Sequence, residues 1–366
     1  MFADRRRRLQ QELKNKGAEA VIIDSPSNLY YYTGFTGGEA MFVMLLKKQV
    51  AALYLITDSR YYEQVEKECP DILLVRMSEQ GYSKTLKELL YKMGVGEEDK
   101  PADIAIEGSM ELTRYLKLCE TCGDMKFQVC SEQINKSRMV KDEAEISKIA
   151  KAEAIGDAAF SHVLGYIKPG VAEADIALEL EFFMKRQGAS ALSFDTIVAS
   201  GTNSSMPHAK VTDKKIGLRE FVTMDFGCVY QGYCSDMTRT VAVGNPTEEM
   251  KKVYQIVLDA NLRAMERVKE GVACNDIDSL ARDYIREQGY GEYFGHGLGH
   301  GVGLDIHEEP RFSPKCTVTA KENMVITIEP GIYLPGRFGV RIEDLVVVKK
   351  GGFDKLSHSE KSLIVL

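Results

Sequence analysis

The chain has 366 residues, with 47 Lys or Arg and 54 Asp or Glu, which gives a formal net charge of −7. Hydrophobic residues make up 44% and charged residues 28%, a balance typical of globular proteins that excludes intrinsic disorder. The length suits about two domains. The acidic balance argues against nucleic acid as a partner. No apolar run approaches the ~18 residues of a membrane-spanning helix.

The basic run Arg5–Arg8 is followed by polar residues rather than by the apolar core of a signal peptide. We interpret it as one basic turn of a surface helix. We therefore expect a cytoplasmic protein whose eight cysteines are reduced thiols. The pair Cys119 and Cys122 has no second CxxC, which argues against a zinc ribbon.

The first ~130 residues predict an accessory α/β domain over residues 1–131. Its expected elements are a strand at Ala20–Asp24, a turn at Ser25–Asn28, strands at Met41–Leu46 and Val50–Ile56, a helix capped by Thr57–Ser59, and a helix over Leu86–Met93. A change in pattern around 131–141 places the border there, and the second domain is expected over residues 132–366.

The second domain contains an internal repeat. Residues 167–188 read IKPGVAEADIALELEFFMKRQG and residues 268–289 read VKEGVACNDIDSLARDYIREQG. Eight of the 22 aligned positions are identical, and each segment ends a helix with Gln-Gly. A single duplication predicts two related halves of one domain rather than a solenoid.

Each helical segment is followed by a pair of strands. The first pair is predicted at Phe221–Val229 and Tyr233–Val243, and the second at Met324–Tyr333 and Val340–Val348. We expect an α+β domain in which helices cover a curved, mainly antiparallel sheet with approximate two-fold internal symmetry.

Each predicted hairpin carries two acids in facing positions. The midpoint between Asp225 and Asp236 falls in the first turn, and Gly336 is midway between Glu329 and Glu343. Residues placed in this way lie roughly opposite one another and share a face. Facing carboxylates in apolar strands repel one another unless a cation or a proton lies between them. An exposed acidic pair at a hairpin end is the alternative.

Histidines gather near these acids in the sequence. His296, His300 and His307 lie in the glycine-rich segment GHGLGHGVGLDIH, and His208 follows Ser205-Met206-Pro207. No phosphate-binding loop, serine-hydrolase elbow or HExxH motif is present. Four carboxylates with imidazole suit a pair of hard-to-borderline divalent ions such as Mn²⁺, Co²⁺ or Zn²⁺. Four exceed what a single zinc ion uses, so two ions about 3.5–4 Å apart are expected.

The motifs MDFG, SDMTRT, GHGLGHGVGLDIHEEP, TIEPGIY and VRIEDLVVV together resemble the pita-bread metallopeptidases, which include methionine aminopeptidase, aminopeptidase P and prolidase. They cover most of the second domain. The segments SPSNLYYYTGF and ITDSRYYEQ resemble the creatinase-like N-terminal domain of the aminopeptidase P and prolidase branch. The resemblance implies a pita-bread fold for the second domain.

The resemblance also implies a role for each matching residue. Asp225 would bind one metal ion, Asp236 and Glu343 would bridge both ions, and His300 with Glu329 would complete the first ion. His208 and His307 would bind substrate and stabilise the tetrahedral intermediate. His296 would be a further pocket histidine, and Arg341 would support a bridging carboxylate. A catalytic role as proton shuttle falls to Glu329.

The implied activity is hydrolysis of an N-terminal Xaa-Pro bond by a hydroxide held between two metal ions, with Mn²⁺ first and Co²⁺ or Zn²⁺ as alternatives. The expected substrates are small peptides with proline at the second position. We favour an aminopeptidase acting on longer peptides. The alternative is a dipeptidase, for which Arg311 or Arg337 would bind the substrate carboxylate.

Three further expectations concern other proteins with this fold and the oligomeric state. A creatinase-like enzyme without metal, or a relative that only binds partners, is disfavoured because all five ligands are present. A plain methionine aminopeptidase is disfavoured by the N-terminal domain. A homodimer is expected from the resemblance alone.

Overall fold

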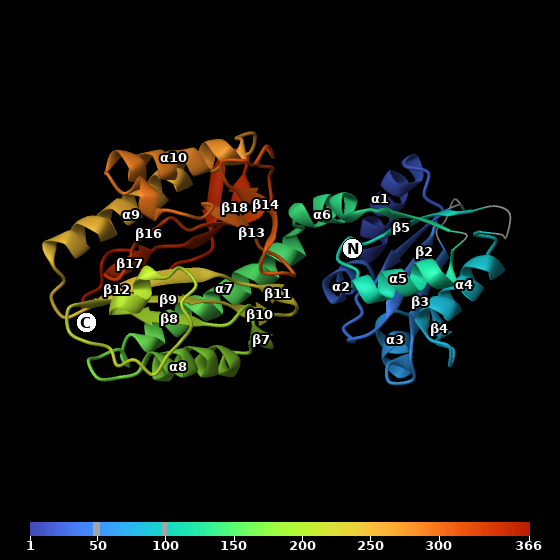
Figure 1. Cartoon of the computed structure of the whole chain (residues 1–366), viewed down its shortest axis with the longest axis horizontal. Coiled ribbons are helices and arrows are strands. Elements are labelled where there is room, and N and C mark those ends of the chain that lie inside the picture. The colour runs from blue at the N-terminus through green and yellow to red at the C-terminus, as the bar shows by residue number, and fades with distance from the viewer. Residues whose placement is uncertain (47–51, 97–100, 124) are drawn as a thin grey trace. The chain divides into compact units, whose positions relative to one another are not determined.

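The computed structural model describes residues 1–46, 52–96, 101–123 and 125–366. They form two compact units, Met1–Ser137 and Arg138–Leu366, which Figure 1 shows. The border expected after residue 131 coincides with the start of α6 (Ser131–Met139), and the two units divide within that helix. None of the helices in the described ranges is long and apolar enough to cross a membrane.

The first unit is built on a mixed six-stranded sheet with the order β4-β3-β2-β1-β5-β6. Its strands are β1 (Ala20–Ile23), β2 (Met41–Leu45), β3 (Ala52–Thr57), β4 (Leu73–Arg76), β5 (Asp103–Ile106) and β6 (Lys126–Val129). Its helices are α1 (Phe2–Asn15), α2 (Pro26–Thr33), α3 (Tyr62–Glu68), α4 (Tyr82–Lys92) and α5 (Leu112–Thr121). Pairing is antiparallel between β1, β2 and β3 and parallel elsewhere. The predicted α/β class is confirmed.

Three details of this unit differ from the prediction. The segment expected to be a turn begins helix α2, with Ser25 as its N-cap and Pro26 in its first turn. Helix α3 begins at Tyr62, beyond the expected cap. Arg5 and Arg6 are buried rather than at the surface, because their guanidinium groups donate to the carbonyl oxygens of the two tyrosines at 31 and 32. Residues 50 and 51 of one predicted strand lie outside the described residues.

The second unit consists of two halves, each of which begins with two helices and continues with strands. The first half has α7 (Glu143–Val163), α8 (Glu173–Arg186), β7 (Ala191–Leu192), β8 (Ile197–Ser200), the 3-10 turn η1 (Gly201–Ser205), β9 (Glu220–Phe226), β10 (Cys228–Tyr230), β11 (Tyr233–Cys234) and β12 (Met237–Val243). The second half has α9 (Glu248–Arg267), α10 (Cys274–Glu287), η2 (Gly291–Tyr293), β13 (Gly299–Gly301), β14 (Glu308–Phe312), β15 (Val325–Ile328), β16 (Gly331–Leu334), β17 (Phe338–Arg341), β18 (Asp344–Lys349) and β19 (Gly352–Lys355).

The strands lie between two pairs of helices, as Figure 1 shows. Apolar side chains of α7 and α8 pack against β8, β9 and β12 in one core. Those of α9 and α10 pack against β15 to β18 in a second core. This helix–sheet–helix arrangement is the predicted pita-bread architecture. The strands that carry the predicted acids lie between the two pairs of helices.

Equivalent hydrogen bonds in the two halves confirm the internal symmetry. Before α8, the N–H of Gly170 donates to the carbonyl oxygen of Ile216 at 2.8 Å; before α10, the N–H of Gly271 donates to that of Ala320 at 2.9 Å. The first residues of the two helices repeat the pattern, because the N–H groups of residues 173 and 274 donate to the carbonyl oxygens of residues 214 and 318. The repeat found in the sequence is therefore a repeat of backbone structure.

Candidate metal centre

The two acids of the first half share one face of the β9–β12 ladder. Asp225 lies inside β9, and its direct partner across the ladder is Thr238. Asp236 precedes that threonine by two residues, so it lies on the same face but diagonally across from Asp225. The side chains were expected to be roughly opposite, and the structure places them two residues out of direct register.

The two acids of the second half lie where two ladders meet. Residues 328 and 344 pair at the end of β15–β18, and residues 331 and 341 pair at the end of β16–β17. The same register continued through the interruption places Glu329 opposite Glu343. The two strands that were predicted as continuous are therefore each interrupted, one at Glu329 and the other at Glu343. Each carboxylate lies at the end of a buried ladder.

His300 closes the cluster from β13. Its Nε2 atom lies 3.4 Å from Asp236 Oδ2 and 3.4 Å from Glu329 Oε1. Its Nδ1 lies 3.0 Å from the carbonyl oxygen of Gly301 and can only donate to it, which leaves Nε2 unprotonated and facing the acids. Within the described residues, ligand atoms of Asp236, His300 and Glu343 all lie within 4.8 Å of one another.

Charge in this cluster is costly. Burial, reinforced by the neighbouring Glu343, raises the pKa of Asp236 well above its usual range, and burial beside Glu329 does the same to the pKa of Glu343. Burial raises the pKa of Glu329 to about 8 and lowers the pKa of His300 to about 3. A divalent cation would reverse the shifts of the three carboxyl groups, because it favours their ionised form, and it would bind the neutral imidazole that burial already favours.

The donor set fits a divalent metal. Carboxylate oxygens with one imidazole nitrogen are ligands of hard-to-borderline ions rather than soft ones. Asp225 gives a second sign, because its buried Oδ1 has no hydrogen-bond partner among the described residues while Oδ2 accepts from Arg341 Nη2 at 2.6 Å. A buried carboxylate oxygen without a donor is the kind of atom that a cation satisfies.

Arg341 connects carboxylates of both halves. Besides binding Asp225, its Nε donates to Thr238 Oγ1 at 3.0 Å, and this hydroxyl donates to Glu343 Oε2 at 2.7 Å. Arg341 is 4% exposed, so its charge is strongly felt by both acids. The sequence indicated Arg341 but not Thr238, whose role depends on the cross-strand register.

A second chain of hydrogen bonds runs from Arg341 to His296. The Nη1 atom of Arg341 donates to Tyr333 Oη at 2.8 Å, and that oxygen lies 2.9 Å from His296 Nε2. His296 Nδ1 lies 2.8 Å from the carbonyl oxygen of Gly297, which makes Nε2 the acceptor of the tyrosine proton. Burial lowers the pKa of His296 to about 4, so this histidine is neutral in the chain. Tyr333 was missed by sequence reasoning because nothing in its local pattern marks it as polar.

All nine residues predicted for the site line one cavity of about 710 Å³. They are His208, Asp225, Asp236, His296, His300, His307, Glu329, Arg341 and Glu343. The ring centres of His300 and His307 are 4.5 Å apart, and both His307 and His208 are exposed. Arg311 also lines the cavity, whereas Arg337 lies elsewhere and pairs with Glu249 at the surface. The acids lie at the buried end of this cavity and the two exposed histidines at its wall.

A buried cluster of carboxylates and imidazole at one end of a peptide-sized cavity is the site of a metallopeptidase. The family model for metallopeptidase family M24 matches residues 147–350, and that for the creatinase/prolidase N-terminal domain matches residues 5–140. The chain therefore belongs to metallopeptidase family M24, in the group that carries this N-terminal domain, and it is a peptidase. The predicted family and fold are confirmed.

Relatives and solved structures match along nearly the whole chain. An uncharacterized peptidase of Bacillus subtilis is 40% identical over 96% of both chains, and an Xaa-Pro dipeptidase of Pyrococcus horikoshii is 37% identical over 94% of both. An Xaa-Pro dipeptidase structure from Bacillus anthracis has a TM-score of 0.94 at 38% identity, covering 100% of both chains. An X-Pro aminopeptidase structure from Thermotoga maritima has a TM-score of 0.88 at 38% identity, covering 98% of this chain and 99% of its own.

Proposed function

We propose that this chain hydrolyses the bond between a first residue and a following proline, with Xaa-Pro dipeptides as its preferred substrates. The observation that carries the proposal is the meeting of Asp236, His300 and Glu343 at the buried end of the cavity. The substrate class follows from relatives at 36–37% identity that are named Xaa-Pro dipeptidases. The sequence alone favoured the aminopeptidase, and these relatives support the dipeptidase better.

Two divalent ions would be held by Asp225, Asp236, His300, Glu329 and Glu343. When bound, they would supply Lewis acidity that polarises the scissile carbonyl and lowers the pKa of water. We propose manganese first, since oxygen ligands dominate the set, with cobalt or zinc as alternatives. Reconstituting metal-free protein with each ion and comparing kcat tests this order.

The chain's own residues supply the remaining chemistry. Glu329 accepts the proton of the attacking water and delivers it to the leaving nitrogen. Proline nitrogen belongs to a tertiary amide, so its departure requires this proton. His307 and His208 stabilise negative charge on the carbonyl oxygen as the tetrahedral intermediate forms. Arg341 holds Asp225 directly, and Glu343 through Thr238, so that the acids keep their positions during turnover.

Arg311 is the residue we propose to select dipeptides. It lies opposite His300 in the β13–β14 ladder, it lines the cavity, and it forms no ion pair with another described residue. A dipeptide presents its carboxylate one residue beyond the scissile bond, where an unpaired guanidinium would bind it. Arg337 is excluded from this role because it is paired outside the cavity.

The aminopeptidase remains the second candidate, because the Thermotoga structure with that activity in its name matches over 98% of this chain. Assaying an Xaa-Pro dipeptide against an Xaa-Pro-Yaa-Zaa tetrapeptide decides between them. Higher kcat/KM for the dipeptide supports the proposal, and higher kcat/KM for the tetrapeptide contradicts it. A homodimer also remains a proposal, which light scattering in solution tests.

A further inference from the structure

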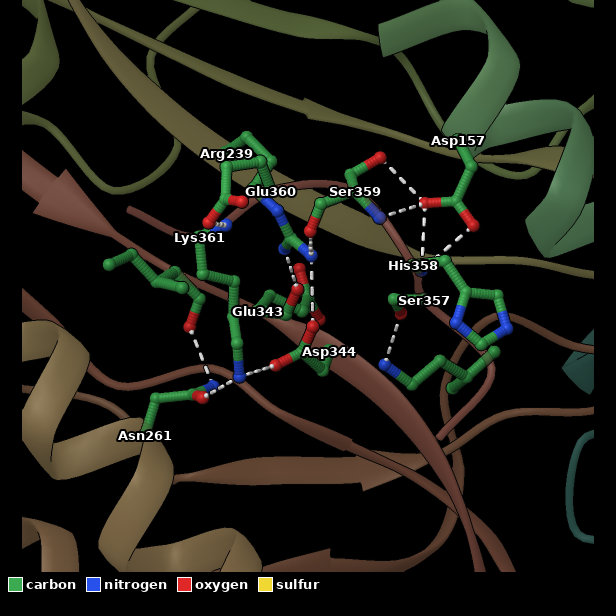
Figure 2. A network of polar contacts seen from close by, with 12 residues as sticks. Asp157, Arg239, Asn261, Glu343, Asp344, Ser357, His358, Ser359, Glu360 and Lys361 are labelled. Carbon is green, nitrogen blue, oxygen red and sulfur yellow. Dashed lines mark hydrogen bonds and ion pairs between the residues drawn. The ribbon is translucent and has the colours of Figure 1, made fainter. Parts of the chain in front are cut away.

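A buried polar network lies next to Glu343 in the chain and in space (Figure 2). Its centre is Asp344, which follows Glu343 in the chain and is completely buried. Lys361 Nζ lies 2.6 Å from Asp344 Oδ2, and Arg239 Nη2 lies 2.9 Å from Asp344 Oδ1. One carboxylate thus binds two cations, one from β12 and one from the segment 357–361 near the C-terminus.

The network reaches the backbone of the proposed ligands. Arg239 Nη1 donates to the carbonyl oxygen of Glu343 itself and to that of Thr238. Its Nη2 also donates to the carbonyl oxygen of Ser359 at 3.0 Å, which fixes the segment 357–361 against β12. Since Thr238 is two residues beyond Asp236, one side chain holds the main chain near acids of both halves.

Lys361 extends the network to the strand residues that precede Glu329 and Glu343. Its Nζ donates to Asn261 Oδ1 on α9 at 2.8 Å. The amide nitrogen of Asn261 donates to the carbonyl oxygens of residues 328 and 342, at 2.9 and 3.3 Å. These residues immediately precede Glu329 and Glu343. With Asn261 Oδ1 bound to the ammonium group, the amide is oriented so that its N–H groups face the two strands.

The same segment also reaches Asp236. Ser357 Oγ accepts from the N–H of residue 345 at 2.7 Å and donates to Glu153 Oε1 at 2.5 Å. The other oxygen of Glu153 accepts from the N–H of Asp236 at 3.3 Å. The segment is held in place from α7, because Asp157 accepts from the N–H groups of residues 358 and 359 at 2.8 and 2.7 Å, as Figure 2 shows.

Such a network is expensive to build and is not needed for packing. Burying charged groups costs several kcal/mol each unless they are well paired, and apolar side chains often stabilise a core as well or better. Apolar side chains cannot hold the four carbonyl groups and two N–H groups that this network binds near the proposed metal-binding acids. Fixing those groups removes the freedom of the backbone that carries the ligands.

We propose that the segment Ser357–Lys361 positions the metal-binding carboxylates, with Lys361 as its principal positioning residue. The inference rests on the proposed metal site, and it concerns residues that do not contact metal or substrate. Lys361 acts through Asn261 on the strands that carry Glu329 and Glu343, and through Asp344 on Arg239.

The test compares Lys361→Met with Lys349→Met. Lys349 makes a similar set of contacts at the far end of β18, with Nζ 3.0 Å from Asn323 Oδ1 and 3.6 Å from Asp354 Oδ2. Both variants lose a lysine from an Asn–Lys–Asp group, but only the group of Lys361 lies next to Glu343. The readouts are Mn²⁺ affinity by calorimetry and the rise in Tm that Mn²⁺ produces over the metal-free protein.

We expect Lys361→Met to bind Mn²⁺ about 10- to 100-fold more weakly than the wild type and Lys349→Met to bind within about twofold of it. The Mn²⁺-dependent rise in Tm shrinks in parallel, because stabilisation by a ligand depends on its affinity. A merely structural role lowers the metal-free and metal-loaded Tm equally. If folded Lys361→Met keeps the wild-type Mn²⁺ affinity and the wild-type Mn²⁺-dependent rise in Tm, the inference is overturned.

Two controls keep the result interpretable. If Lys361→Met does not fold, Ser357→Ala, which loses only a hydroxyl between residue 345 and Glu153, is judged by the same measurements. If the wild type itself neither binds Mn²⁺ nor gains Tm, the proposed metal site fails and this inference fails with it. If the wild type and the variant bind Mn²⁺ equally well and gain equally in Tm, the positioning role is contradicted while the proposed metal site stands.

Discussion

The two halves of the second unit share a backbone but differ in the chemistry of their side chains. Each contributes two carboxylates from a hairpin, Asp225 and Asp236 in one and Glu329 and Glu343 in the other. The second half adds five nitrogen-bearing side chains to the cavity wall, whereas among the described lining residues the first half adds only His208. The five are His296, His300, His307, Arg311 and Arg341. The paired carboxylates, with His300, suit the metal ions, and the unpaired His307 and Arg311 suit a substrate, which has no symmetry.

The starts of the two repeated helices show the same division. The first residue of α8 is Glu173, which is fully buried and accepts hydrogen bonds from Ser200, Asn203 and Thr212, on both sides of His208 in the chain. The equivalent residue of α10 is Cys274, which packs into the apolar core. One backbone position thus organises a polar loop in one half and fills a core in the other.

The largest effect is expected from the symmetric acids. Replacing Asp236 by Ala removes a ligand from the centre of the cluster, and we expect kcat on an Xaa-Pro dipeptide to fall by at least about 10³-fold. Glu343→Ala, the counterpart from the other half, should match it. Bound metal, measured by elemental analysis of Mn²⁺-supplemented protein, should drop with activity. Substantial turnover by metal-replete Asp236→Ala protein would sink the proposed function.

The asymmetric histidine is the next test. His307→Ala leaves all five proposed ligands in place and removes one group that stabilises the oxyanion, so kcat should fall on the order of 10²-fold. Metal content should stay at the wild-type level, in contrast to Asp236→Ala. Steady-state kinetics with parallel metal analysis separates the two classes. A loss of metal in His307→Ala would show that the proposed division between metal-binding and substrate-binding groups is wrong.

A site residue can be predicted from the sequence when its role shows in the residues near it in the chain. The acids were recognised because they interrupt apolar strands at matched distances from a turn. Thr238 and Tyr333 were missed because a hydroxyl within a strand acquires its role only through the register with Arg341. Their function is a property of strand pairing, which a local pattern does not contain.

The corrected details of the first unit have the same cause. The segment at Ser25 resembles a turn locally, but Glu107, 82 residues away, accepts from the N–H and the hydroxyl of Ser25. This contact fixes the first turn of α2. Arg5 looked exposed because it lies in a basic run, yet its guanidinium group lies 4.0 Å from the ring centre of Tyr31, which covers it. Long-range partners decided both outcomes.

The different roles of Glu173 and Cys274 can be tested by measuring how a substitution at each position changes the free energy of unfolding. Glu173→Gln should lower the free energy of unfolding by about 1–3 kcal/mol, because an amide cannot accept all the hydrogen bonds that the carboxylate accepts. Cys274→Ala removes one buried sulfur atom and should cost about 1 kcal/mol. Urea unfolding of both variants gives the numbers. Only Glu173→Gln should also reduce kcat, through His208, and equal kinetics in the two variants would contradict this assignment.

The smallest effect is expected at Arg311 in the wall of the cavity. Arg311→Ala should raise KM for an Xaa-Pro dipeptide about 10-fold, equivalent to about 1.4 kcal/mol of lost binding, because the substrate carboxylate loses its partner. For an Xaa-Pro-Yaa-Zaa peptide, whose carboxylate lies two residues further away, KM should hardly change. Arg337→Ala is the matched control, because that arginine is paired with Glu249 outside the cavity. Equal effects of Arg311→Ala on both peptides would show that this arginine does not read the carboxylate, and selection by length would then have to come from the shape of the cavity.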